Sequence, residues 1–178
     1  DRALMDFSDV ALGRCPLARG AVDHPDVKGL SLLTAPMSLS PSLTIDKVRA
    51  MLDTARGQYD YILIDSPAGL GAGFRLAICG ADRALVIATN DASSLRDAQR
   101  TVCELESIRQ VHLIMNRIQP KLLRKLRATI DDAMNTAGLP LIGVVPEDNQ
   151  VMLAANLGQP LTAQGRRGAA LACWNIAL

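Results

Sequence analysis

The apolar residues of this chain gather in short aliphatic runs that recur along the sequence. Each run is nearly continuous, and such runs are typical of strands that are buried on both faces of a sheet. They cover residues 30–35, 59–65, 83–89, 111–116 and 140–145. We therefore predict five strands, separated by segments with a different pattern.

The segments between these runs carry apolar residues three and four positions apart, which is the spacing of one helix face. This pattern predicts helices over 43–56, 92–107 and 120–136. Strands that alternate with helices indicate βαβ units. We expect the α/β class, with a mostly parallel β-sheet, helices on both faces, and a single domain over residues 1–178.

Composition narrows the class of protein. Of the 178 residues 49% are hydrophobic and only 3% are aromatic, so the core must be aliphatic. The net charge of +1 argues against a strongly basic nucleic-acid-binding protein, and we expect no nucleic acid partner. No CxxC pair occurs among the four cysteines, so we expect reduced thiols in a cytosolic protein.

Asp65 ends the aliphatic run 59–65 and leads into the glycine-rich sequence SPAGLGAG. In open parallel sheets, ligands bind beyond the carboxyl ends of the strands. A carboxylate at that edge suits Mg²⁺ on a nucleotide, and Gly69 would let the backbone approach a phosphate. A Walker-B aspartate with a switch loop, or a plain Ser-Pro turn after a strand, explains this segment equally well.

Three further stretches decide between these interpretations. They are TNDASSLRDAQR at 89–100, MNR at 115–117 and IGVVPEDNQVMLAANLGQPL at 142–161. Together with IDSPAGLGAG, they resemble the deviant Walker-A (ParA/MinD) P-loop family from about Ser8 to Leu161. The S-S-x-R-D-x-x-R and P-E-D…A-N-x-G-x-P runs point to its MinD branch of septum site-determining ATPases.

The resemblance implies ATP and Mg²⁺ as cofactors and assigns residues to them. Asp65 resembles the Walker-B aspartate that holds the magnesium shell, and no residue is assigned as a catalytic base. The expected nucleotide-binding residues are Gly69 at the γ-phosphate, Asn116 and Arg117 at adenine, and Pro146, Glu147 and Asp148 in the turn that closes the adenine pocket. That turn would also cap the helix after it.

One part of the family pattern does not occur in this sequence. No G-x-x-x-x-G-K-[ST] phosphate loop is present, so the expected fold is P-loop NTPase-like without its first strand and phosphate loop. Because that loop supplies most of the charge that holds the phosphates, we expect ATP hydrolysis in the intact protein and none by this chain alone.

The resemblance implies a switch in division-site placement, in which ATP drives dimerisation and membrane association. The expected partners are a second copy, division-inhibitor and activator proteins, and the membrane surface through a tail not present here. The expected location is cytoplasmic, peripheral at the inner face of the cell membrane. The alternatives are a partition or flagellar-placement ATPase, or a non-enzymatic interaction module that has lost the phosphate loop.

Three local expectations complete the sequence analysis. Ser93 and Ser94 are good caps for the helix at 92–107. The basic run 121–127 fits a solvated helix face balanced by nearby acids. The C-terminal segment, apolar almost all round after Arg167, predicts a buried packing helix with Trp174 in the core.

Overall fold

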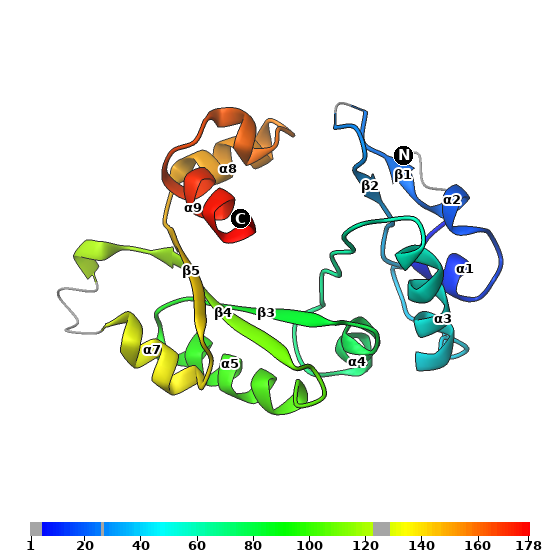
Figure 1. Ribbon diagram of the computed structural model, residues 1–178, viewed down its shortest axis with the longest axis horizontal. Helices are drawn as coiled ribbons and strands as arrows, with labels where there is room; N and C mark the ends of the chain where they lie inside the picture. The colour runs from blue at the N-terminus through cyan, green and yellow to red at the C-terminus, as the bar shows by residue number, and fades with distance from the viewer. Residues whose placement is uncertain (1–4, 26, 123–128) are drawn as a thin grey trace. The chain divides into compact units, whose positions relative to one another are not determined.

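The computed structural model describes residues 5–25, 27–122 and 129–178 (Figure 1). The chain divides into two compact units, Asp1–Ala81 and Asp82–Leu178. The expectation of a single domain over both units stays a prediction. Among the described residues, no helix combines the length and apolarity needed to cross a bilayer.

The first unit is built around one amphipathic helix. Its elements are α1 (Phe7–Ala11), α2 (Leu17–Gly20), β1 (Val22–Asp23), β2 (Ser31–Leu32), α3 (Ile45–Arg56) and α4 (Ala72–Ile78). The face of α3 that carries Val48, Met51 and Leu52 is buried against apolar side chains of α1 and α2. The helix predicted over 43–56 is therefore confirmed, with Thr44 as its N-cap.

Two predicted strands of this unit differ from the structure. The run 30–35 forms only β2, which pairs antiparallel with β1. The run 59–65 belongs to no strand, and Tyr61 and Leu63 are 89% and 93% exposed. A strand needs a neighbour to pair with its backbone groups, and no described residue pairs with this run.

The second unit contains the parallel sheet. Its elements are β3 (Arg83–Ala88), α5 (Ala92–Glu104), β4 (Gln110–Ile118), α7 (Ile130–Ala137), β5 (Leu141–Pro146), α8 (Asn149–Asn156), the 3₁₀ helix η1 (Leu161–Gln164) and α9 (Gly168–Ala177). The strands lie in the order β3-β4-β5, and both pairings are parallel. The runs predicted at 83–89, 111–116 and 140–145 are thus confirmed as strands.

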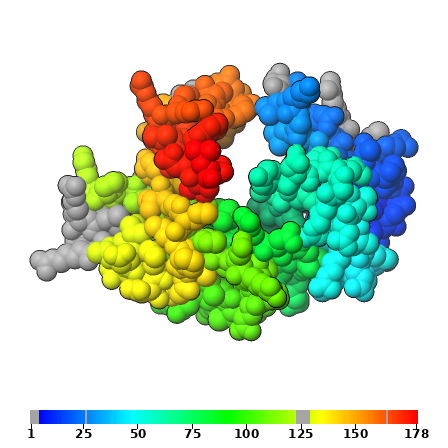
Figure 2. Space-filling view, viewed as in Figure 1, coloured from blue at the N-terminus to red at the C-terminus, as the bar shows by residue number. Residues whose placement is uncertain are grey.

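Helices cover the two faces of this sheet. In Figure 1, α5 and α7 lie on one side and α9 lies on the other, against β5. Figure 2 shows the red atoms of α9 in contact with the yellow segment that contains β5. Leu113 and Met115 of β4 are fully buried in the middle strand, whereas Leu85 and Ile87 of β3 are exposed.

The helix predicted over 120–136 is not continuous. Pro120–Leu122 are helical, but Thr129 has an extended backbone and begins α7 with a capping box shared with Asp132. An N-cap residue cannot also lie inside a helix, because its backbone is not helical. Leu126 and most of the basic run 121–127 lie outside the described residues.

The C-terminal helix is only partly buried, so the prediction that Trp174 belongs to the core is wrong. Ala169 and Ala170 are buried, but Trp174 is 38% exposed and lies under the guanidinium of Arg166, 4.0 Å from the ring centroid. Ala169, Ala172 and Ile176 pack toward β5, whereas the indole lies beside a cation that it can attract.

Candidate functional site

The carboxyl ends of β3, β4 and β5 lie along one edge of the second unit's sheet, because the three strands are parallel. Asn116 and Arg117 stand near the end of β4, and Pro146 and Glu147 stand at the end of β5. Arg117 has a φ of 55°, and among the residues that the structure describes no other residue except glycine has a positive φ. Its backbone N–H donates to Oδ1 of Asn116 at 2.9 Å.

Glu147 joins these two strand ends. Its backbone N–H donates to the carbonyl of Ile118 at 3.0 Å. One carboxylate oxygen lies 3.4 Å from Nη2 of Arg117, and the other accepts a hydrogen bond from Nε2 of Gln119. Arg117 and Glu147, both predicted as site residues, are therefore brought together.

Gln119 was not predicted from the sequence. It follows Arg117 by two residues, just beyond the end of β4. That spacing is a weak signal, because nothing in the sequence shows that Glu147 lies within reach of both side chains.

Asp148 caps two helices at once. Its Oδ1 accepts from the backbone N–H of Gln150 at 2.9 Å, at the start of α8. Its Oδ2 accepts from the backbone N–H of Ala169 at 3.0 Å, in the first turn of α9. These bonds, that from Gln150 first, lower the pKa of Asp148 below its ordinary value. The expected cap on the helix after β5 is confirmed, and a role of Asp148 at adenine stays a prediction.

Gly168 is required by this double cap. Its φ is +50°, and a Cβ built on it would lie 2.1 Å from Oδ2 of Asp148. A side chain at position 168 would therefore both strain the backbone and displace the carboxylate. Neither Gly168 nor Ala169 was predicted to contact Asp148, because the contact joins segments that are distant in the sequence.

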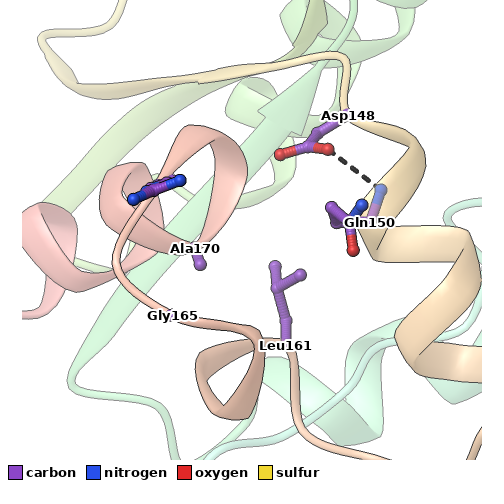
Figure 3. Close-up of a pocket in the computed structure, with 6 residues that line it drawn as sticks. Asp148, Gln150, Leu161, Gly165 and Ala170 are labelled. Atoms are coloured by element: carbon purple, nitrogen blue, oxygen red, sulfur yellow. Dashed lines mark hydrogen bonds between the residues drawn. The ribbon is translucent and has the colours of Figure 1, made fainter.

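A pocket of about 260 Å³ opens beside Asp148, between α8, η1 and α9 (Figure 3). Asp148, Gln150, Leu161, Gly165, Arg167 and Ala170 line it. Pockets for small organic ligands usually measure about 300–1,000 Å³. This pocket lies just below that range, and its carboxylate already bonds to the backbone of Gln150.

The end of β3 is closed by its own hydrogen bonds. Asp91, not Ser93 or Ser94, is the N-cap of α5, and its carboxylate accepts from the N–H of Ser94 at 2.9 Å. The hydroxyl of Ser94 instead accepts from the N–H of Thr89 at 2.9 Å. The Thr89 hydroxyl, followed by the Ser94 N–H, lowers the pKa of Asp91. The Asp91 carboxylate therefore already bonds to groups of this turn.

Asp65 and Gly69 belong to the first unit. Asp65 is exposed at the end of the run 59–65, so its oxygens are accessible to a metal ion. Gly69 has a φ of +83°, and a Cβ built on it would meet no atom within 4 Å. An accessible carboxylate followed by open backbone fits a hydrated Mg²⁺ and a phosphate, which need oxygen ligands and N–H donors.

No protein-family model matches the chain. The septum site-determining protein MinD of Helicobacter pylori is 38% identical over 172 residues, covering 90% of this chain and 64% of that protein. MinD of Bacillus subtilis is 31% identical over 183 residues, covering 99% of this chain and 68% of that protein. The chain belongs to the MinD family. It spans somewhat less than two thirds of the H. pylori protein.

Solved structures of MinD have the same fold. MinD of Aquifex aeolicus matches 99% of this chain and 74% of its own, with a TM-score of 0.88 and 31% identity, and it is also solved as a MinC:MinD complex. MinD of Pyrococcus horikoshii, solved with Mg-ADP, has a TM-score of 0.77 but only 22% identity, so that likeness shows the fold alone. Membership of the MinD family confirms the predicted α/β fold of P-loop type.

Proposed function

We propose that this chain carries the adenine-recognition part of a MinD-like ATPase that switches between monomer and dimer in division-site placement. The observation that carries the proposal is the meeting of Asn116, Arg117 and Glu147 at the carboxyl ends of two neighbouring parallel strands. Ligands of open α/β sheets bind at this edge. An amide can donate to and accept from one base edge, and a guanidinium plane can lie against a ring.

Asp65 and Gly69 are proposed to serve Mg²⁺ and a phosphate group. Asp65 would hold the hydrated Mg²⁺ through its exposed carboxylate, and Gly69 would present its backbone to the terminal phosphate. The bound ion would supply positive charge against the phosphate oxygens. The P. horikoshii relative was solved with Mg-ADP, which agrees with this choice of cofactor.

The proposed partners follow from the same family membership. A second copy would bind when ATP is bound, and a division inhibitor of the MinC type would bind next, as MinC does with the A. aeolicus protein. An activator protein and the membrane surface complete the proposed cycle. Hydrolysis would release the dimer, which makes the protein a positional switch at the inner face of the cell membrane.

The test is calorimetric titration of Mg-ATP into this 178-residue chain and into a version extended upstream to the length of its H. pylori relative. Binding by the extended version alone supports the proposal. Binding by neither version favours a non-enzymatic interaction module. Binding by the short chain would contradict the expectation that a phosphate loop supplies most of the affinity.

Asn116→Ala in the extended version tests base recognition. We expect about tenfold weaker Mg-ATP binding with an unchanged fold, because one well-placed hydrogen bond to a ligand contributes about that factor. Asn135→Ala, at an exposed position of α7, is the matched control and should bind as the unsubstituted protein does. Equal affinities for the two variants would contradict a base contact by Asn116.

A further inference from the structure

The end of β4 contains an extra residue. Met115 lies opposite Val144 and Ile118 lies opposite Pro146, so β4 advances by one residue more than β5 over this stretch. The added residue forms a bulge at Asn116 and Arg117, and Arg117 takes a left-handed backbone there. Bulges often redirect a side chain next to a functional site, and a left-handed arginine persists only where its surroundings hold it.

Four contacts hold the bulge. Oδ1 of Asn116 accepts from the Arg117 N–H, and the Ile118 carbonyl accepts from the Glu147 N–H. The Glu147 carboxylate then receives Arg117 on one oxygen and Gln119 on the other. The side chains on either side of Ile118 therefore meet on one carboxylate of the neighbouring strand.

Arg117 and Glu147 alone would restrain each other weakly. Their side chains are 70% and 37% exposed, and their closest atoms are 3.4 Å apart. Exposed ion pairs of this kind contribute little because solvent screens them and both side chains keep other rotamers. A second donor on Glu147 limits its rotamers, which turns a loose ion pair into a defined position for the guanidinium.

We propose that Gln119 is a positioning residue, which fixes Glu147 and through it the guanidinium of Arg117 against the bound adenine. This inference rests on the proposed function. With one oxygen on Gln119 and the other on Arg117, Glu147 acts on the nucleotide through Arg117 and not by its own contact with the base. A neutral amide suits this task, because it donates to the carboxylate without competing as a second cation.

The experiment is a Mg-ATP titration of the extended version and of the same version with Gln119→Leu. This exchange keeps the side-chain bulk but removes the hydrogen-bond donor. We expect about fivefold weaker binding by Gln119→Leu. Gln110→Leu, at the other end of the same strand, is the matched control and should bind as the unsubstituted protein does. Urea unfolding midpoints of both variants should lie close to that of the unsubstituted protein.

The role through Arg117 is tested by repeating Gln119→Leu in an Arg117→Ala background. We expect less than a twofold further loss there, because no guanidinium remains to be positioned. The exchange Gln119→Glu with Glu147→Gln should bind more tightly than Gln119→Glu alone, which places two carboxylates together. An unchanged affinity for Gln119→Leu, or an equal loss in both backgrounds, would overturn the positioning role. Absence of Mg-ATP binding by the unsubstituted protein would overturn the proposed function itself, and the positioning role with it.

Discussion

Asp148 shows how a proposed nucleotide-binding residue can also have a structural role. Its two oxygens accept backbone N–H groups from α8 and α9, and charged acceptors make the stronger kind of hydrogen bond. The side chain therefore joins the turn after β5 to the C-terminal helix.

We predict that Asp148→Asn lowers the urea midpoint of unfolding at neutral pH, because the two N–H groups bond to different oxygens and the NH₂ group of an amide cannot accept one of them. The folded-state pKa of Asp148 is lowered from 3.8, so its stabilisation is present above that value and is lost as pH falls through the folded pKa. The difference between variant and unsubstituted protein should therefore shrink below about pH 4.

Fluorescence of Trp174, the single tryptophan in the sequence, would follow this unfolding in the second unit. Asp97→Asn is the control, since the Asp97 carboxylate is exposed and its ion pair with Arg100 is a long one, at 3.9 Å. A midpoint difference for Asp148→Asn that is constant from pH 7 to pH 3 would contradict the capping role of the charge.

At the residue scale, the sequence predicts which residues lie at the carboxyl edge of the sheet but not which residues they contact. Asp148 was expected as a cap because Asp is favoured before a helix, and the local pattern was sufficient. Its second partner, Ala169, and the contact between Gln119 and Glu147 depend on which segments lie together in space. No local pattern contains that information.

At the scale of elements, α9 packs closely on β5 because a glycine faces it. A Cβ built on Gly143 would lie 2.3 Å from Cγ1 of Ile176. The missing side chain lets the helix approach the strand that ends in Pro146 and Glu147. The position of α9 and the position of the carboxyl edge of the sheet are therefore linked through β5.

We predict that Gly143→Ala destabilises the second unit and that Ile176→Ala relieves the clash. In a double-mutant cycle, the two losses should sum to more than the loss of the double variant, with a coupling of about 1 kcal/mol or more. The measurement is urea unfolding followed by Trp174 fluorescence. Additive losses would contradict direct packing between these two positions.

Element prediction succeeded where a run has neighbours within the chain. The runs at 83–89, 111–116 and 140–145 pair with one another and form strands. The run 59–65 has the same aliphatic pattern but pairs with no described residue. Hydrophobic patterning records the preference for burial, whereas a strand also requires a partner for its backbone.

At the scale of the whole molecule, the alternation of strands and helices was sufficient to predict the α/β class and the parallel sheet. The relatives confirm that class through their family and fold. The division into two compact units was not predicted, because the sequence shows no change of composition near Ala81.

We predict that Asp65→Ala in the extended protein abolishes Mg-ATP-dependent dimerisation, since the exposed carboxylate is proposed to hold the ion. Light scattering with and without Mg-ATP measures the change in mass. Asp60→Ala, another exposed acid a few residues upstream, should dimerise normally. Dimerisation of Asp65→Ala at the level of the unsubstituted protein would contradict a metal-binding role.

The contact between Asp148 and Gly168 also has a consequence for how this sequence can evolve. A side chain at position 168 would occupy the space of the carboxylate, and loss of the acid would leave only the positive φ to favour glycine there. The two positions are therefore expected to vary together, although they are not neighbours in the sequence. A lineage that keeps Asp148 is therefore expected to keep Gly168 as well.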